Sequence, residues 1–315
     1  MSTPKIGLAL GGGSARGWAH IGVIRELEAL GIKPDIVCGA SAGALVGGIY
    51  VSGYLDIFEK WLRQLDKRQI FHYLDMNLVL RGGFIEGKRL IEYFREMMGD
   101  CNIEDLDCEY VAVATDLTNG REIWLRSGSI LDAIRASIAI PGFFTPVLKD
   151  EHWLIDGGLS NPVPVSVCRA LGADIVIAVD VNDGMRSNKA RKIIQSGESE
   201  DEEDSVEMGM LDRWATGLKV RASMLLTNVF KSEQTKPGLF DVLSSSMSIV
   251  QDRITRNRMA NDPPEVLLYP HLSGIGLLEF NKAEEAIAEG RACTRRHLAA
   301  LEYVLPDILK PQPDK

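Results

Sequence analysis

The pentapeptide Gly39–Gly43, with the sequence GASAG, constrains the fold of this chain more than any other stretch. It follows a short apolar run at 35–38 that is typical of a buried strand, and it precedes residues 44–51, which have the composition of a helix. A G-x-S-x-G sequence between a strand and a helix is the nucleophile-elbow pattern. The turn is so sharp that a Cβ on either flanking glycine would collide with its neighbours. We therefore predict that Ser41 presents its hydroxyl at the tip of the turn, at the N-terminus of the helix.

Strand-like and helix-like segments alternate along the first 180 residues. Apolar runs predict strands at 6–10, 35–38, 110–115, 122–125, 153–155 and 175–179, and helical patterns occupy 16–30, 44–51, 54–69, 88–98, 130–138 and 164–171. The last strand is apolar throughout, as expected for a central strand covered on both faces. We expect strands 110–115 and 122–125 to pair. This order predicts an α/β fold with three layers, in which helices cover both faces of a mostly parallel sheet.

The chain changes character after residue 182. Residues 183–206 are polar, and six of the seven residues from Glu198 to Asp204 are acidic, which predicts a flexible acidic linker. Residues 207–315 predict a mainly helical C-terminal extension packed on the core, with one strand at 266–269 and a final helix at 279–303.

Two apolar stripes in this extension recur at helical spacing. One contains Leu211, Trp214, Leu218, Leu225 and Val229, and the other contains Leu243, Met247, Val250 and Ile254. Such stripes are typical of helices that pack on a core, and we expect this role for both. A surface that faces a membrane or a partner is the alternative.

The composition narrows the class of protein. A formal net charge of −9 disfavours nucleic-acid binding. The five cysteines are scattered without a C-x-x-C pair, so neither a disulfide framework nor a zinc site is indicated. No apolar run approaches the roughly 20 residues that span a bilayer, and the chain opens without a signal-peptide pattern. We therefore expect a cytoplasmic protein.

A glycine-rich loop, 11–17, follows the first predicted strand and opens a helix. Such a loop can bind a dinucleotide, but Ser14 replaces the middle glycine of G-x-G-x-x-G, and Asp35 begins the next strand instead of ending it. Consecutive backbone N–H groups at a helix N-terminus also form an anion nest. Beside a nucleophilic serine, that nest would serve as an oxyanion hole for acyl transfer.

Ser41 needs a base, and the sequence does not favour a histidine. The elbow comes too early for the usual α/β-hydrolase triad. The histidines have no motif around them; they are His20, His72, His152, His271 and His297. Asp156, which ends the predicted strand 153–155 and precedes two glycines, is a better candidate, with an ordinary Asp-Gly turn as the alternative.

Three motifs in this order resemble those of patatin-like phospholipases. They are GGSARG at 12–17, GASAG at 39–43 and DGG at 156–158. The segment 133–137 with 140–143, and the segment 156–165, also resemble family blocks. The resemblance covers about residues 6–180. It implies a patatin-like catalytic core at 6–182 with the three-layer fold described above.

Carried over by position, the resemblance implies a Ser41–Asp156 dyad, in which Asp156 accepts the proton of Ser41. It implies an oxyanion hole formed by Gly12, Gly13 and the Ser14 amide, with Arg16 holding the loop or balancing its charge. Ser14 departs from the glycine usual in the family.

The flanking glycines Gly39, Gly43, Gly157 and Gly158 support these motifs. The implied chemistry passes through an acyl-enzyme and needs no metal or cofactor. The implied activity is hydrolysis of fatty-acyl esters of phospholipids or lysophospholipids by a cytoplasmic enzyme with transient peripheral contact at the inner membrane. The expected partner is a lipid or acyl-ester substrate, and no nucleic acid. An acyltransferase with the same dyad and a non-catalytic lipid-binding regulatory protein remain alternatives. The sequence does not give the head group, the chain length or the oligomeric state.

Overall fold

The computed structural model describes residues 4–65, 85–182 and 239–309. Within them, eight strands form one sheet in the order β5-β6-β3-β2-β1-β7-β8, with β4 paired to β3. The strands are β1 (Ile6–Leu10), β2 (Ile36–Ala40), β3 (Glu109–Asp116), β4 (Glu122–Leu125), β5 (Val147–Lys149), β6 (His152–Asp156), β7 (Ile175–Val179) and β8 (Val266–Leu268). Every strand predicted from the sequence is present, and β5 is an additional one.

The central strands are parallel. β1 pairs in parallel with β2 and β7, β2 with β3, and β7 with β8, whereas β4 and β6 run antiparallel to β3 and β5 antiparallel to β6. In this register Leu10 lies opposite Gly39, so β1 and β2 end side by side. The glycine-rich loop and the elbow therefore start at the same edge of the sheet, where α/β proteins commonly place their sites.

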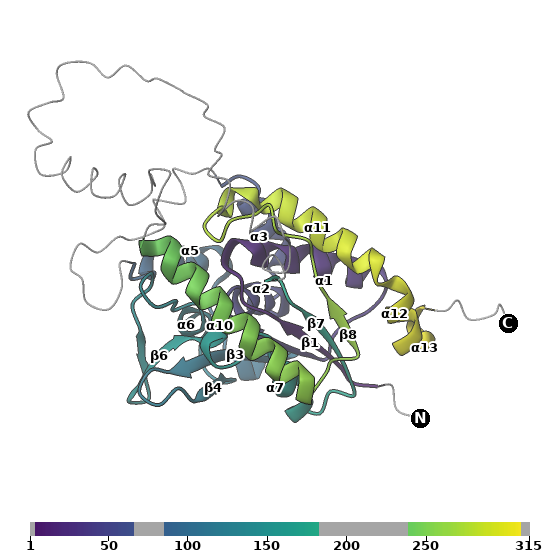
Figure 1. Cartoon of the computed structure of the whole chain (residues 1–315), viewed down its shortest axis with the longest axis horizontal. Coiled ribbons are helices and arrows are strands. Elements are labelled where there is room, and N and C mark those ends of the chain that lie inside the picture. Colours follow the sequence, from purple (N-terminus) through teal and green to yellow (C-terminus); the bar gives the residue numbers. More distant parts are fainter. Residues whose placement is uncertain (1–3, 66–84, 183–238, 310–315) are drawn as a thin grey trace, which may run out of the picture.

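Helices cover both faces of this sheet, as Figure 1 shows. The α-helices are α1 (Ala19–Ala29), α2 (Ala42–Val51), α3 (Leu55–Leu62), α5 (Lys88–Met98), α6 (Ile130–Ser137), α7 (Val165–Ala170), α10 (Leu239–Asn261), α11 (Ala283–Arg296), α12 (Leu298–Val304) and α13 (Pro306–Leu309). Short 3-10 turns are η1 (Ser14–Trp18), η2 (Ile103–Asp105), η3 (Gly157–Leu159) and η5 (Phe280–Lys282).

Side chains alternate between the two faces along each strand, as the pleat of a strand requires. Leu8 and Leu10 of β1 belong to a large apolar core shared with α1, α2 and α11. Ala9 points to the other face and belongs to a smaller core with Val167 and Cys168 of α7. The three-layer α/β/α prediction is confirmed.

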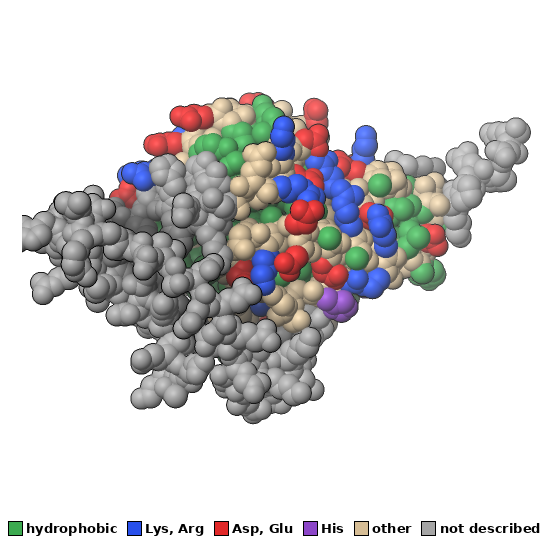
Figure 2. Space-filling model, turned by 90° about the horizontal axis from the view of Figure 1, so that it is seen from above, with side chains coloured by type: hydrophobic (Ala, Val, Ile, Leu, Met, Phe, Trp, Pro, Cys, Tyr) green, Lys and Arg blue, Asp and Glu red, His purple; other side chains and the backbone are tan. Residues whose placement is uncertain are grey.

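The C-terminal helix α11 crosses α1 at very short range. A Cβ on Gly22 would run into the carbonyl of Ile287, and a Cβ on Gly290 would run into that of Ala19. Buried Glu26 accepts hydrogen bonds of 2.7 and 2.9 Å from Arg295 of α11. Figure 2 shows basic and acidic side chains interleaved on this face. The glycine pair and the ion pair fix α11 against the core.

Helix boundaries in this region differ from the prediction. The predicted final helix 279–303 is divided into η5, α11 and α12, with a break at His297. The predicted helix 54–69 is described only as far as residue 65, and α3 ends at Leu62. The acidic linker 183–206 and the stripe from Leu211 to Val229 lie outside the described residues.

The orientation of α10 corrects one prediction. The stripe from Leu243 to Ile254 was expected to face the core, but Leu243 and Val250 are 40% and 46% exposed. The face that packs on the sheet carries Ser248, Gln251 and Thr255 instead. Gln251 packs closely on η3, because a Cβ on Gly158 would run into its side-chain amide. Across the described helices, none combines the length and the apolar character needed to cross a bilayer.

Candidate active site

Ser41 lies in the sharp turn between β2 and α2. Its backbone has φ 53° and ψ −123°, a conformation that non-glycine residues rarely adopt. A Cβ on Gly39 would lie 2.5 Å from the backbone nitrogen of Ala44, and one on Gly43 would meet the carbonyl of Leu10. Both flanking glycines are therefore required by close packing, as the pentapeptide predicted. Ser41 itself is 4% exposed and stands at the N-terminus of α2.

A second serine holds this strained turn in place. The backbone N–H of Ser41 donates a 2.9 Å hydrogen bond to Oγ of Ser137, at the end of α6. The hydroxyl of Ser137 donates in turn to the carbonyl of Val113 on β3, at 2.6 Å. Ser137 is fully buried. Ser137 ends the segment 133–137 that resembles a family block, but sequence spacing alone does not indicate this contact.

Asp156 ends β6 and is fully buried. Its Oδ1 accepts a 2.8 Å hydrogen bond from the N–H of Gly158, while Oδ2 has no hydrogen-bond partner among the described residues. Burial raises the pKa of this carboxyl to about 6, and the nearby Ser41 hydroxyl and the Gly158 N–H oppose the rise. The structure thus brings Ser41 and Asp156 together without a formed hydrogen bond. Such contacts commonly tighten when substrate binds.

The glycine-rich loop lies directly against the elbow. A Cβ on Gly12 would lie 3.2 Å from Cβ of Ser41. The Gly12 N–H, however, donates to the carbonyl of Pro162 at 3.0 Å, so it does not point a free donor at the site. The prediction that Gly12 supplies an oxyanion donor is therefore revised. Its contribution is the lack of a side chain beside Ser41.

Three other amides remain as candidate donors. Within the described structure, the N–H groups of Gly13 and Ser14 form no backbone hydrogen bond. Ser14 has φ 51°, so a serine occupies the left-handed conformation that the family glycine would favour. The third is Ala42, whose N–H begins α2 and has no partner within the helix. The N–H after the nucleophile is a common oxyanion donor.

His20 supports the loop from within α1. Its Nε2 lies 2.7 Å from the carbonyl oxygen of Gly11. Burial lowers the pKa of this imidazole to about 4, so the ring is neutral at pH 7 and Nε2 must carry the hydrogen that the carbonyl accepts. No motif surrounds His20 in the sequence, and only the fold shows its contact with the loop.

Arg16 connects the loop to the C-terminal region and does not point to Ser41. Its Nε donates a 2.8 Å hydrogen bond to the carbonyl of Ile275. Burial lowers the pKa of its guanidinium, and the carboxylate of Glu279 opposes this shift. Of the two roles expected for Arg16, the contacts correspond to holding the loop.

An apolar cavity of about 110 Å³ opens beside the two serines of the site. Apart from Ser14 and Ser41, the lining side chains are aliphatic or aromatic. Among them are Trp18, Leu45, Phe94 and Phe280. This surface suits a hydrocarbon chain bound beside Ser41.

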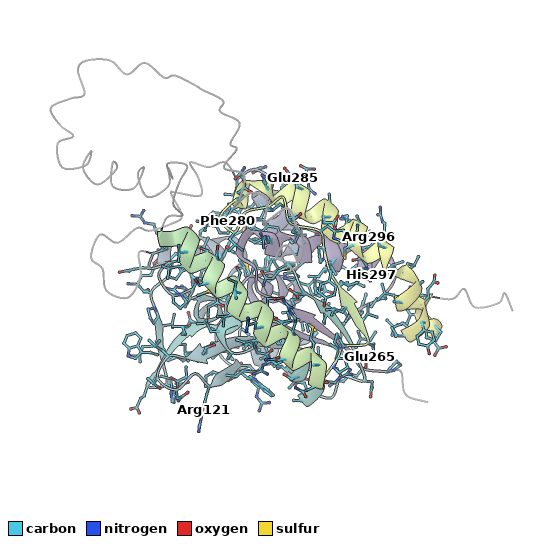
Figure 3. The ribbon with its side chains drawn as sticks, viewed as in Figure 1. Arg121, Glu265, Phe280, Glu285, Arg296 and His297 are labelled. Atoms are coloured by element: carbon cyan, nitrogen blue, oxygen red, sulfur yellow. The ribbon has the colours of Figure 1, made fainter. Side chains whose placement is uncertain are left out.

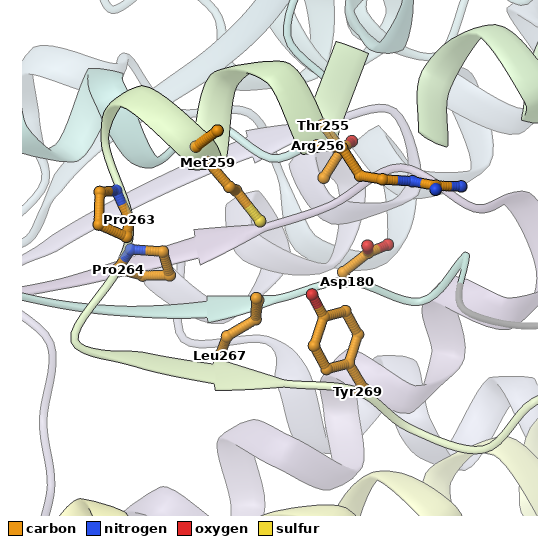
Figure 4. A pocket seen from close by; sticks show the side chains of 9 residues that line it. Asp180, Thr255, Arg256, Met259, Pro263, Pro264, Leu267 and Tyr269 are labelled. Atoms are coloured by element: carbon orange, nitrogen blue, oxygen red, sulfur yellow. The ribbon is translucent and has the colours of Figure 1, made fainter. Parts of the chain in front are cut away.

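A second cavity, of about 280 Å³, lies between α10 and the β7–β8 edge of the sheet (Figure 4). Its lining includes Asp180, Thr255 and Tyr269 and none of the predicted catalytic residues. A chain of hydrogen bonds links it to the loop: the N–H of Asn182 donates to Asp180, and its side-chain amide donates to the carbonyl of Gly12 at 2.8 Å.

Comparison with known proteins settles the family. Residues 8–169 match the family model described as patatin-like phospholipase. This chain belongs to the patatin-like phospholipase family. The matched region contains the glycine-rich loop, the elbow and Asp156, and it ends before β7.

Relatives of this patatin-like chain include proteins of similar and of much greater length. An uncharacterized NTE family protein of Mycobacterium tuberculosis is 32% identical over 96% of this chain and 93% of its own. Lysophospholipase nte1 of Emericella nidulans is 27% identical over 94% of this chain, which corresponds to 18% of that protein. The solved structure of VipD from Legionella pneumophila overlaps with 95% of this chain and 67% of its own, at a TM-score of 0.44 and 14% identity.

Proposed function

We propose that this protein is a serine hydrolase that cleaves fatty-acyl esters of lysophospholipids or phospholipids through a Ser41–Asp156 dyad. The observation that carries the proposal is the buried Asp156 carboxyl, with its pKa raised to about 6, beside a serine in a strained elbow. A buried carboxylate with such a pKa is a stronger base than an ordinary aspartate and is still ionised at pH 7. Family membership supports the same assignment.

In the first step, Oγ of Ser41 attacks the ester carbonyl carbon while Asp156 accepts the hydroxyl proton. The carbonyl oxygen becomes an oxyanion, which the N–H groups of Gly13, Ser14 and Ala42 would stabilise. Each such donor typically contributes about 3 kcal/mol to the transition state. The N-terminus of α2 adds a favourable dipole.

The oxyanion intermediate then collapses. The C–O bond to the alcohol breaks, and the leaving oxygen takes the proton from Asp156. The fatty-acyl group remains as an ester on Ser41. Water then attacks this ester, giving its proton to the ionised Asp156. Collapse of the second tetrahedral intermediate releases the fatty acid and returns the proton to Ser41.

The substrate class follows from the cavity and from a relative. The apolar lining favours an acyl chain, and a lysophospholipid is supported by the relative that is named a lysophospholipase. A lysophospholipid has a single acyl chain, which matches the single apolar cavity found beside Ser41 among the described residues.

We propose that a lipid substrate reaches the cavity past the N-terminal end of α10. Leu243 reaches close to Gly142, where a Cβ would lie 3.5 Å from its Cδ1, and Gly142 lies between the cavity residues Ile140 and Phe144. Val242 and Leu243 are exposed at this end of the helix. We propose that the enzyme works in the cytoplasm and that this end of α10 makes a peripheral and transient contact with a lipid surface.

The test begins with a fluorophosphonate probe, which should label wild type at Ser41 and leave Ser41→Ala unlabelled. Purified enzyme should then release fatty acid from lysophospholipid micelles, and Ser41→Ala should lose about 10³-fold or more of this rate. Product analysis with and without an added alcohol separates hydrolysis from acyl transfer. Absence of labelling, while a control hydrolase is labelled under the same conditions, would contradict the proposal.

A further inference from the structure

The cavity beside Ser41 is completed by a part of the chain outside the matched family region. The family match ends at residue 169, but Phe280 of η5 lines the same cavity as Ser14, Trp18 and Ser41. Figure 3 shows Phe280 at the end of the loop that leads into α11. The C-terminal region is therefore part of the substrate surface as well as a cover on the core.

Three hydrogen bonds join the loop at 275–280 to η1. The N–H of Ala15 donates to the carbonyl of Leu277 at 3.1 Å, and Nε of Arg16 donates to that of Ile275 at 2.8 Å. The indole N–H of Trp18 donates to the carbonyl of Phe280 itself at 3.3 Å. Two of these donors lie immediately after Ser14, so the same contacts hold the loop that carries the candidate oxyanion donors.

The loop is also braced internally. Glu279 accepts a 2.6 Å hydrogen bond from the N–H of Gly276 and lies 3.2 Å from the ammonium group of Lys282. Lys282 in turn donates to the carbonyl of Gly274 at 3.0 Å. Beyond Lys282, α11 is fixed on α1 by the close glycine crossing described above. Phe280 is thus presented from a rigid support, which is the requirement for a side chain that selects a ligand by shape.

The ring of Phe280 packs on Trp18, with ring centroids 6.0 Å apart, and Trp18 packs edge-on against Phe58 at 5.8 Å. Trp18 and Phe280 form an aromatic wall on the η1 side of the cavity, and Phe58 lies buried behind it. We propose that Phe280 determines the acyl-chain preference of this enzyme by forming the part of that wall which longer chains reach. This inference rests on the proposed function and adds a specificity residue to it.

The physical expectation is a chain-length effect. Burial of one methylene contributes about 0.8 kcal/mol, or about fourfold in kcat/KM, as long as the next carbon still finds apolar surface. An acetyl ester has a single methyl carbon beyond its carbonyl, so it buries little of this wall. A longer chain buries more of it, so removal of the ring penalises long chains selectively.

The experiment measures kcat/KM of wild type and Phe280→Ala on p-nitrophenyl esters from acetate to dodecanoate. The ratio of decanoate to acetate should fall by about tenfold in Phe280→Ala. Phe280→Leu, which keeps an apolar side chain, should recover most of that ratio. Leu278→Ala is the matched control, because Leu278 is on the same loop, is 42% exposed and does not line the cavity, and it should leave the ratio unchanged.

A binding measurement tests the role of Phe280 independently of the proposed hydrolysis. Calorimetric titration of Ser41→Ala with decanoate below its micelle concentration reports on the cavity without turnover. Adding Phe280→Ala to this background should weaken decanoate binding by about tenfold. Equal losses for acetate and decanoate esters, or unchanged decanoate binding, would overturn the role of Phe280. Loss of turnover with decanoate binding still sensitive to Phe280 would contradict the proposed hydrolysis alone.

Discussion

The backbone N–H of Ser41 donates a 2.9 Å hydrogen bond to Oγ of Ser137, and both residues are buried. The acceptor comes from the C-terminal end of α6, whereas Ser41 begins α2, so this contact ties the elbow to a second helix. A residue in a rarely populated φ/ψ region persists only where its surroundings hold it there. Ser137 is thus a positioning residue for the proposed nucleophile.

We predict that Ser137→Ala lowers kcat by about 10- to 100-fold with little change in KM, because a buried N–H left without a partner costs about 1–3 kcal/mol. Steady-state kinetics on a short ester would measure this separation of kcat from KM. Ser52→Ala is the matched control, since the hydroxyl of Ser52 donates to the carbonyl of Gly48 and contacts Sγ of Cys101, and neither contact involves Ser41 or Ser137. A Ser137→Ala enzyme with wild-type kcat would show that the elbow keeps its geometry without this contact.

The pKa of Asp156 predicts the acid limb of the activity profile. Burial raises this pKa to about 6, and only the ionised carboxylate can accept the proton of Ser41. We expect kcat/KM to fall tenfold per pH unit below about pH 6 and to be level just above it. The measurement is a profile on an ester that does not itself titrate between pH 4 and 8. A profile that stays flat down to pH 4 would exclude Asp156 as the base.

The raised pKa of Asp156 also makes the folded protein less stable as pH rises, in the range where the activity increases. The folded state binds the Asp156 proton more tightly than the unfolded state, whose value is near 3.8, so this group lowers the free energy of unfolding as pH rises from about 4 to 6. The difference of roughly two pKa units corresponds to about 3 kcal/mol above pH 6.

Asp156→Asn removes this buried charge. We predict that at pH 8 the variant is more stable than wild type, by up to about 3 kcal/mol, while its esterase activity falls by about 10³-fold or more. Urea unfolding at pH 8 and at pH 5 would measure the gain, which should shrink at the lower pH. His20, whose lowered pKa acts in the opposite direction between pH 4 and 6.5, is unchanged in both proteins and cancels in the comparison.

The donor role of Ser14 can be tested by restoring the family glycine. In Ser14→Gly the backbone N–H remains, and the positive φ of 51° becomes unstrained. We predict kcat/KM within about threefold of wild type, because the candidate donor is the backbone N–H, which this substitution leaves in place. A loss of 10²-fold or more in kcat would mean that the Ser14 hydroxyl, and not its amide, acts in the reaction.

The sequence was most informative where chemistry depends on near neighbours. The glycines of the elbow, the apolar run of β7 and the strand that ends at Asp156 are all consequences of local sterics and of the alternation of side chains, and the structure has them as predicted. The pairing of β3 with β4 follows from their proximity along the chain.

Sequence reasoning failed where a short segment had two possible orientations. The stripe from Leu243 to Ile254 has helical spacing, but spacing does not say which face of a helix meets the sheet. Here η3, which follows β6, meets Gln251 at Gly158, and Leu243 and Val250 of the stripe turn outward. Likewise, nothing near Gly12 indicates that its N–H is taken up by the carbonyl of Pro162.

The amino-acid sequence by itself determined the α/β architecture and the residues proposed to react, because turn sterics, strand periodicity and motif order are local properties of the chain. Only the tertiary structure decided how those residues are held. Ser137 reaches Ser41, His20 reaches Gly11, and Phe280 reaches the cavity through contacts between distant segments. Such contacts depend on how helices dock on the sheet, and docking is set by the packing of the whole core, which no single stretch of sequence encodes.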